Sequence, residues 1–427
     1  MRRVVIVSGA RTPVGRFGGT LKDIPCAELG ALAIKGAFKK VSARPVANPT
    51  AQRFGQSTLI EEGRIELEKA GYDYPGSLCP VPVDEVIMGN AVGAGQGQNL
   101  ARQASLRSGI PKEAPAYTVN KVCGSGLKAV TLAAQAIASG EADVIVAGGV
   151  ENMSRIPYAL PAARWGARMH DATMVDLLIH DGLWEGFYGY HIGITAENLQ
   201  ALYGISRREQ DELAAQSHRR ARRAIADGLF ADEIVPVRIV PKKGAPFFFD
   251  TDERPVDTTV EKLAQLPPAF REDGTVTAGN ASGVNDAAAA LLLMSEKKAK
   301  ELGLRPLARV VSYASGGVDP AYMGLGAVPA VRSALSRAGL TVGDLDLVEL
   351  NEVFAVQAIG CTRELGLDPE KTNVLGSGIS IGHPIGCTGA RILVTLIHEL
   401  RRRGGELGLA GLCIGGGMGM AMVVAAA

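Results

Sequence analysis

KVCGSGLKAV, at residues 121–130, places a cysteine beside glycines directly ahead of an alanine-rich apolar run. The apolar run VDEVIMGN (83–90) precedes this stretch, and the run DVIVAGG (143–149) follows it. Short apolar runs that alternate with helical patterns are typical of buried strands covered by helices. The stretch therefore predicts a glycine turn that leads into a helix between two strands of an α/β fold.

The same order of landmarks returns in the second half of the chain. LDLVELNE (345–352) is followed by the turn GSGISIGHPIGCTGARI (376–392) and then by GLCIGGGMG (411–419). Asp84 and Cys123 are 39 residues apart, and Asp346 and His383 are 37 residues apart. This spacing predicts two duplicated βαβ-rich halves whose glycine turns face one another across a pseudo-twofold axis. The alternative is that any two α/β segments look alike at this level of detail.

Residues 156–280 differ from the two halves in their sequence pattern. They contain both tryptophans, the aromatic stretch GFYGYH (186–191) and a charged helix that begins at the capping box Ser206-x-x-Glu209. The later part of that helix, HRRARR (218–223), could meet ligand phosphates, but a solvated helix face is the simpler interpretation. We therefore predict that this segment is an insertion that leaves one half and returns to it.

Another excursion interrupts the first half. Residues 44–80 are rich in proline and polar groups, and their charged part, LIEEGRIELEKAGY (59–72), predicts a short helix on the surface. The predicted organisation is an N-terminal half, an inserted domain and a C-terminal half. Their bounds are 1–155 (with the 44–80 insert, completed by about 281–305), 156–280 and 306–427.

Composition limits the class of protein. The 427 residues carry 45 Lys+Arg and 44 Asp+Glu, a net charge of +1, which favours neither nucleic acid nor a membrane surface as partner. No run reaches about 18 uninterrupted apolar residues, as a transmembrane helix would need. The six cysteines form no CxxC pair, so we expect free thiols in a reducing compartment, by default the cytoplasm.

Cys123 is the first candidate for chemistry. Gly124 and Gly126 let the backbone turn sharply, and the N-terminus of the following helix is expected to stabilise a thiolate and lower the thiol pKa. A nucleophilic cysteine needs this activation. The alternative is a small residue packed at a turn, which is the commoner role of a buried cysteine.

Two further residues occupy comparable glycine-rich turns. His383, in SIGHPIGCTG, is positioned to take a thiol proton, and Cys413 precedes three glycines whose amides can bind an oxyanion. GGGMGM and GAGQGQ lack the GxGxxG spacing of a dinucleotide loop, and no HExxH pattern indicates a metal. Two thiols and an imidazole suit thioester chemistry, in which one sulfur holds an acyl group and another moves a proton next to a carbonyl.

Seven stretches in order show that the sequence resembles the thiolase family over essentially the whole chain except 44–80. They are VCGSG, GGVENMS, FYGYHIGITAEN, TAGNASGVND, NEVFA, GHPIGCTGAR and CIGGGMG. The FYGYH stretch and Met323 resemble the short-chain acetyltransferase branch of that family. The resemblance implies duplicated βαβ halves that form a five-layered α/β/α/β/α core with an inserted α+β loop domain. Thiolases need no cofactor and use coenzyme A thioesters as substrate and product.

The resemblance also implies catalytic roles. Cys123 would be the acylated nucleophile, and His383 would be its base. Cys413 would deprotonate the methyl group of a second acetyl-CoA. Asn351 would hold a water that forms the enolate oxyanion hole together with His383 Nε2. The amides of Cys123 and Gly415 would form the other oxyanion hole.

The resemblance also implies which residues contact the substrate. His191 would lie near the thioester sulfur, while Phe354 and Met323 would line the acyl pocket. The implied coenzyme A contacts are Ser282 and Ala278 along the pantetheine, Leu183 and Phe270 beside it, and Arg254 as an approximate match near the adenine. Thiolases are usually dimers or tetramers assembled partly through the inserted domain, so we expect a homotetramer or homodimer.

Three positions depart from the family pattern. NVLGSG (373–378) has Leu375 where the family has an amide, Val353 replaces a smaller alanine, and Ile192 replaces a methionine. Leu375 is expected to loosen the polar network behind the active site, whereas Val353 and Ile192 are expected to alter the shape of the pocket. None of the three removes a catalytic role.

The expected activity is reversible condensation of two acetyl-CoA molecules to acetoacetyl-CoA and CoA. A broader-chain degradative 3-ketoacyl-CoA thiolase is the alternative within the family. A decarboxylating ketoacyl synthase would share the duplicated fold, but Cys413 argues against it. A non-catalytic module that binds lipid or protein is a further hypothesis, and the joint presence of Cys123, Asn351, His383 and Cys413 argues against that one.

Overall fold

A computed structural model describes residues 2–53 and 63–427. Its central sheet runs in the order β16-β17-β18-β15-β1-β14-β7-β5-β6, with β2 paired to β14. The nine strands on this path are β1 (Val4–Arg11), β5 (Glu85–Gly89), β6 (Ala116–Val119), β7 (Val144–Asn152), β14 (Asn285–Ser295), β15 (Ala308–Gly317), β16 (Leu347–Leu350), β17 (Leu407–Ile414) and β18 (Met418–Ala426), and β2 covers Gly15–Arg16.

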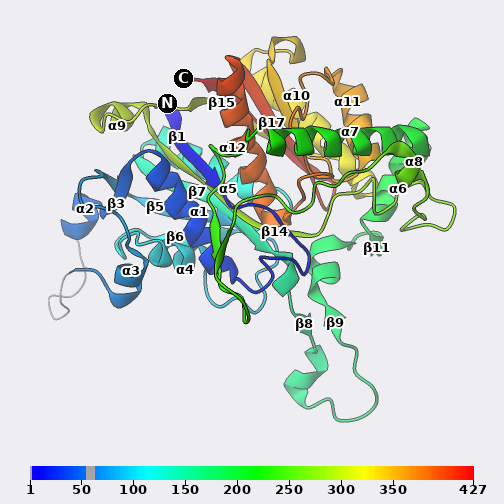
Figure 1. The fold of residues 1–427 in the computed structure, drawn as a ribbon, viewed down its shortest axis with the longest axis horizontal. Coiled ribbons are helices and arrows are strands. Elements are labelled where there is room, and N and C mark those ends of the chain that lie inside the picture. The colour runs from blue at the N-terminus through cyan, green and yellow to red at the C-terminus, as the bar shows by residue number, and fades with distance from the viewer. Residues whose placement is uncertain (1, 54–62) are drawn as a thin grey trace.

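Helices cover the two halves of this sheet and fill the space between them (Figure 1). Helices α5 (Ser125–Ser139) and α12 (Ile385–Arg403) form the middle layer, because their apolar residues share one core with strands of both halves. Helices α1 (Cys26–Lys40) and α4 (Leu100–Arg107) cover the first half, and α10 (Ala327–Ala338) and α11 (Ala355–Leu365) cover the second. The predicted five-layered α/β/α/β/α core is confirmed.

The two halves are joined edge to edge by main-chain pairing. Strand β1 meets β15 over only two residue pairs, Val5 with Arg309 and Ile6 with Ala308. The sheet is therefore continuous in its hydrogen bonding, although its two parts lie on opposite sides of the middle helices.

Repeated local contacts support the predicted duplication. Asp84, directly before β5, accepts hydrogen bonds from the backbone amides of residues 143–144 at 2.7 and 2.8 Å. Asp346, directly before β16, accepts hydrogen bonds from the amides of residues 406–407 at 2.8 and 2.9 Å. An aspartate at the equivalent position thus anchors the start of the neighbouring strand in each half.

Glycines allow α5 and α12 to pack backbone against backbone. A Cβ on Gly126 would lie 2.8 Å from the amide nitrogen of Ala390, and a Cβ on Gly389 would lie 2.5 Å from that of Leu127. Real side chains do not tolerate such distances, so only glycine fits at these two positions. The first turns of the two helices therefore meet, and the turns ahead of them open at the same edge of the sheet.

The inserted segment forms short strands and helices, as an α+β insertion should. Its capping box is present, because the Ser206 side chain accepts from the Glu209 amide and Glu209 bonds back to Ser206. Its elements are β8 (Tyr158–Ala159), η2 (Pro161–Trp165), β9 (Val175–Asp176), η3 (Leu178–Leu183), β10 (Trp184–Glu185), β11 (Tyr190–His191), α6 (Gly193–Tyr203), α7 (Arg207–Ala226), β12 (Val237–Ile239), β13 (Phe247–Phe249) and α8 (Val260–Ala264).

One part of the insertion projects away from the body. Strands β8 and β9 form the base of an arm, and the chain between them lies at its far end (Figure 1). Trp165 and Met169 on this arm are 82% and 81% exposed. Exposed apolar groups gathered on one projection indicate a contact surface.

The prediction of a solvated face at residues 218–223 is only partly correct. Arg219, Arg222 and Arg223 are exposed, but His218 is buried. Arg220 turns inward and donates to the carbonyl of Thr372 at 2.8 Å. The helix therefore uses part of this face to hold the C-terminal half.

The 44–80 excursion begins and ends with a parallel pair, β3 (Ala43–Ala47) and β4 (Cys79–Val83). The predicted helix at 59–72 begins outside the described residues, and the observed helix α3 covers only Glu66–Gly71. The other short elements are α2 (Pro49–Arg53), η1 (Met153–Arg155), α9 (Glu296–Glu301), η4 (Pro320–Gly326) and η5 (Val342–Asp344). Within the described ranges, no helix combines the length and apolar character needed to cross a membrane.

Candidate active site

The turn that carries Cys123 is strained. Val122 has φ +47°, which is a left-handed conformation that a β-branched residue rarely adopts and that costs about 1–3 kcal/mol. Side chains hold it there, since Asn120 Oδ1 accepts from the Val122 amide at 2.9 Å and Ser125 Oγ donates to the Val122 carbonyl at 2.6 Å. Sequence reasoning missed this strain, although the flanking Asn and Ser are typical turn-forming residues.

The Cys123 thiol is protonated in the resting protein. Burial raises its pKa to about 11, while the backbone N–H groups of Gly415 and of Cys123 itself act in the opposite direction. The expectation that the helix N-terminus would give a low pKa is therefore wrong. Reaction at this sulfur requires a nearby base to take the proton.

Cys413 lies at the end of β17, just before the loop of Gly415, Gly416 and Gly417. Burial raises its pKa well above the usual value, and the neighbouring Cys123 and Cys361 act in the same direction. The Gly415 amide reaches the Cys123 sulfur, so this short loop bridges the two thiols. The sequence motif thus brings both sulfurs into one buried site.

His383 is held as a neutral base. Its ring Nδ1 lies 2.7 Å from Thr388 Oγ1, and that hydroxyl already donates to the Pro384 carbonyl at 3.0 Å. With that hydroxyl donating to Pro384, the ring donates from Nδ1 and the lone pair lies on Nε2, which is the tautomer that can take a proton from a thiol. Burial, with Arg391 acting in the same direction, lowers the His383 pKa to about 3.

Asn351 completes this side of the site. Its Nδ2 lies 3.3 Å from His383 Nδ1. Within the described part of the chain, Asn351 Oδ1 and His383 Nε2 are buried polar atoms without a hydrogen-bond partner. Buried polar atoms left free in this way are ready to bind a substrate group or a water.

Backbone contacts bring Cys123 and His383 together at one edge of the sheet, and they bring Asn351 close to Cys413. Cys123 and His383 precede α5 and α12, whose first turns touch. The Asn351 amide donates to the Gly411 carbonyl at 2.9 Å, and Cys413 lies two residues further along the same strand. These contacts gather the four predicted catalytic residues around the ends of the middle helices.

An apolar wall lies beside Cys413. The His191 ring stacks on Phe270 with centroids 4.8 Å apart, and Phe270 meets Phe354 edge-on at 6.1 Å. The hydrophobic cluster that contains Cys413 also includes Val353 and Ile192, two of the three positions that depart from the family pattern. Other residues of this cluster that the sequence singled out are Met323, Phe354, Leu183 and Phe270.

The other predicted contacts occupy varied surroundings. Ser282 donates its amide to the Val353 carbonyl at 2.7 Å, and Ala278 is exposed nearby. Arg254 donates to the carbonyls of Ile379 at 2.7 Å and Ala281 at 3.0 Å. Its guanidinium therefore holds two loops together, and its contact with adenine stays a prediction.

Leu375, the third departure, is buried and belongs to the central hydrophobic core. The apolar side chain therefore fits its surroundings.

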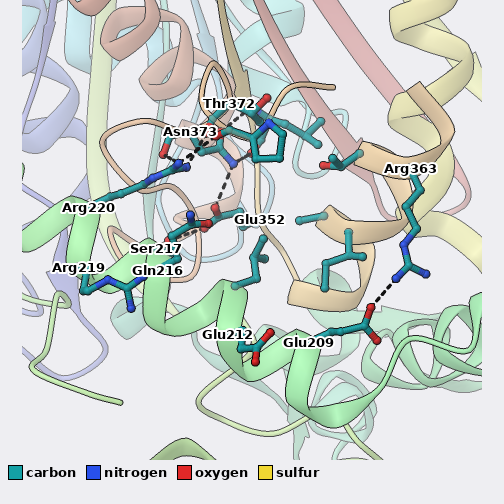
Figure 2. A pocket seen from close by; sticks show the side chains of 16 residues that line it. Glu209, Glu212, Gln216, Ser217, Arg219, Arg220, Glu352, Arg363, Thr372 and Asn373 are labelled. Atoms are coloured by element: carbon teal, nitrogen blue, oxygen red, sulfur yellow. Dashed lines mark hydrogen bonds and ion pairs between the residues drawn. The ribbon is translucent and has the colours of Figure 1, made fainter. Parts of the chain in front are cut away.

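A separate cavity of about 480 Å³ lies between α7 and α11 (Figure 2). At its inner end, Glu352 accepts from Ser217 Oγ at 2.6 Å and from Asn373 Nδ2 at 3.0 Å. At its rim, Arg363 pairs with Glu209. None of the predicted catalytic residues lines this cavity.

Comparisons with known proteins cover the whole chain. Residues 68–297 match the family model "Thiolase, N-terminal domain", and residues 304–426 match "Thiolase, C-terminal domain". The acetyl-CoA acetyltransferase of Pseudomonas aeruginosa is 53% identical over 426 residues, with 100% of each chain covered. Two solved structures, the acetyl-CoA acetyltransferase of Bacillus anthracis and the human mitochondrial 3-ketoacyl-CoA thiolase, match with TM-scores of 0.88 and 0.87. Their identities are 45% and 41%, and each match covers 100% of this chain and 99% of the other.

Proposed function

The chain belongs to the thiolase family, and from that premise we propose that it is an acetyl-CoA C-acetyltransferase. Such an enzyme catalyses the reversible Claisen condensation of two acetyl-CoA molecules to acetoacetyl-CoA and CoA. The observation that supports this proposal is that two neighbouring buried thiols lie near the edge where the first turns of α5 and α12 touch, and that His383, directly ahead of α12, keeps a free Nε2.

In the first half-reaction, His383 Nε2 takes the proton from Cys123 Sγ. The thiolate attacks the thioester carbonyl, and the amides of Cys123 and Gly415 hold the oxyanion that develops. When the C–S bond of acetyl-CoA breaks, the CoA sulfur leaves with the proton from His383. Cys123 is then an acetyl thioester, and the histidine is neutral again.

In the second half-reaction, His383 Nε2 takes the proton of the Cys413 thiol, and the resulting Cys413 thiolate takes a proton from the methyl group of another acetyl-CoA. The protonated Nε2 and a water on Asn351 then donate to the enolate oxygen, which lowers the cost of this charge in a dry site. The enolate carbon attacks the acetyl group, and the Cys123–acyl bond breaks. The Cys123 sulfur takes the proton from His383 Nε2, so Cys123, Cys413 and His383 all return to their neutral forms.

The aromatic and aliphatic wall supports a short acyl group. Phe354 and Met323 pack tightly with Cys413, and Val353 adds bulk where the family usually has alanine. We expect kcat/KM for thiolysis of 3-ketoacyl-CoA to fall at least about tenfold between four and eight carbons, because each poorly fitted methylene costs about 1 kcal/mol or more. Steady-state kinetics with four- to sixteen-carbon substrates tests this. Equal activity beyond four carbons would favour the broader-chain thiolase.

Coenzyme A would lie along the inserted domain. Ser282 and Ala278 would contact the pantetheine, with Leu183 and Phe270 beside it and His191 near the thioester sulfur. Arg254 would approach the adenine end only after releasing one of its carbonyl partners. We propose a reaction that needs no cofactor beyond the coenzyme A thioesters.

The exposed arm between β8 and β9 supports a homotetramer. Trp165 and Met169 at its end offer apolar area that another copy of the arm can cover. We expect a Trp165→Ser, Met169→Ser protein to sediment as a dimer and to keep its activity. Leu202→Ser, which changes an exposed apolar residue on α6, is the matched control and should leave the tetramer intact. An unchanged sedimentation coefficient for the arm variant would contradict this role.

The remaining assignments follow from the same premise. The six cysteines are free, which suits a reducing compartment, and we propose the cytoplasm. The two family halves would comprise 1–155 with about 281–305, and 306–427, with 156–280 as the inserted coenzyme A domain.

A further inference from the structure

Glu151, near the end of β7, is a fully buried carboxylate that collects four N–H groups. Its Oε1 accepts from Asn90 Nδ2 at 2.8 Å and from the Val92 amide at 3.2 Å. Its Oε2 accepts from the Ala91 amide at 2.8 Å and from the Gly386 amide at 2.9 Å. One side chain thus joins the loop after β5 to the first turn of α12.

This cluster continues without a break to the nucleophile. The Ala91 carbonyl accepts from Asn120 Nδ2 at 2.9 Å, and Asn120 Oδ1 accepts from the Val122 amide at 2.9 Å. Val122 is the strained residue directly before Cys123. The conformation of the Cys123 turn is therefore tied, through Asn120 and Ala91, to Glu151.

On its other side, Glu151 fixes the histidine turn. Gly386 lies three residues after His383 in the first turn of α12. A carboxylate at that point satisfies an amide that the helix leaves unpaired and is favoured by the positive end of the helix. A Cβ on Gly386 would collide with Glu151 Oε2, so glycine is required for this close approach.

Over residues 2–53 and 63–427, no lysine or arginine forms an ion pair with the Glu151 carboxylate. The titratable groups that face it are thiols, namely Cys26 of α1, Cys123 ahead of α5 and Cys387 of α12. An uncompensated buried charge is costly, so four donors aimed at one carboxylate indicate a function beyond packing.

We propose that Glu151 is a positioning residue that locks the Cys123 turn to the His383 turn, so that Sγ and Nε2 are held in register for proton transfer. This inference rests on the proposed function for its chemistry. Glu151 touches neither substrate nor the reacting atoms and acts only through the two turns.

The central test is Glu151→Gln. The amide group of glutamine must place its NH2 against two of the four N–H donors, so the hydrogen bonds from those donors are lost. We expect the single-turnover rate of Cys123 acetylation, followed by mass spectrometry, to fall about 10²-fold, as misplacement by about 1 Å can cause. Asp84→Asn is the matched control. It also neutralises a carboxylate that accepts from two backbone amides, but at the opposite end of the same strands. Both amides donate to the same oxygen, Oδ2, so an asparagine can keep both bonds, and the rate should change less than about threefold.

The pH profile separates positioning from simple loss of stability. Burial raises the Glu151 pKa to about 7, whereas the pKa values of Cys123 and His383 lie far from neutrality, at about 11 and about 3. As the pH rises through about 7, the carboxylate forms, accepts all four N–H groups and orders both turns. Wild-type acetylation should therefore increase through that pH, and Glu151→Gln should be flat there.

A double-mutant cycle supplies the decisive outcome. Asn120 is exposed, and Asn120→Ala should slow acetylation by breaking the same chain of hydrogen bonds at another point. Because both substitutions interrupt one chain, the double variant should be slower than Glu151→Gln by less than the factor that Asn120→Ala causes alone. Fully multiplicative effects, or wild-type acetylation and pH profile in Glu151→Gln, would overturn the proposal.

Alkylation by iodoacetamide keeps this test independent of the substrate. If the wild-type protein is not acetylated by acetyl-CoA, the proposed function fails. The pH profile of Cys123 alkylation in the same variants then still tests whether Glu151 positions the two turns. An alkylation profile that Glu151→Gln leaves unchanged would overturn the positioning role.

Discussion

Replacing Cys123 with alanine is expected to abolish both acetylation and turnover, lowering kcat by about 10⁴-fold or more. The physical reason is that no other group in the site can hold the acyl chain. Cys413 is buried with a strongly raised pKa, and its role is to remove the methyl proton of the second acetyl-CoA. His383 has only one free nitrogen, which is needed as the base. Mass spectrometry after mixing with acetyl-CoA should show the acetyl adduct in wild type and none in the variant.

Loss of fold would not explain such a result. The substitution removes one small sulfur from a turn held by Asn120 and Ser125. Cys79→Ala, which removes a thiol from β4 far from the catalytic turns, is the control and should keep its activity. Undiminished thiolysis by a Cys123→Ser protein would contradict the nucleophile assignment and reopen the case for a non-catalytic module.

The sequence is most informative where the chemistry is local. Cys123, His383 and Cys413 each lie in a glycine-rich turn that can be recognised within ten residues, and the order of the turns reveals the duplication. Strands β5, β7, β16 and β17 follow for the same reason, because each is one short apolar run. Their pairing then follows from the preference of such runs for a buried sheet covered by helices.

The features that the sequence does not reveal depend on residues distant in the chain. Glu151 belongs to the stretch GGVENMS, but its partner Gly386 is 235 residues away, so no local pattern indicates the contact. The Cys123 pKa is predicted in the wrong direction because burial, which depends on the whole fold, outweighs the effect of the nearby N–H groups. The surroundings of His218 and Arg220 cannot be inferred from one helix, because His218 accepts from the distant Val256 amide at 3.3 Å and Arg220 donates to the Thr372 carbonyl at 2.8 Å.

Burial explains why this site needs two cysteines and a neutral histidine and not a preformed ion pair. A thiolate and an imidazolium would both be disfavoured in a site that excludes water. A neutral pair can instead transfer the proton only as the thioester carbonyl is attacked, when the amides of Cys123 and Gly415 are in place to receive the new charge. Accurate placement of the two turns then controls the rate.

Replacing Cys413 with alanine is expected to separate the two half-reactions. Cys123 and His383 keep their contacts, so acetylation should proceed within about tenfold of the wild-type rate. Condensation should fall by about 10²–10⁴-fold, the usual cost of losing a general base. Rapid mixing with acetyl-CoA, with separate detection of the acetyl-enzyme and of acetoacetyl-CoA, measures both steps.

Cys361→Ala is the matched control for this experiment. Cys361 is also buried and lies close enough to influence the Cys413 pKa, but its sulfur contacts the Gly324 carbonyl at 3.2 Å and belongs to α11. Removing it takes away a neighbouring thiol without taking away the base, so both half-reactions should persist. Rapid condensation by Cys413→Ala would mean that His383 alone moves both protons, and the division of work between the two sulfurs would be wrong.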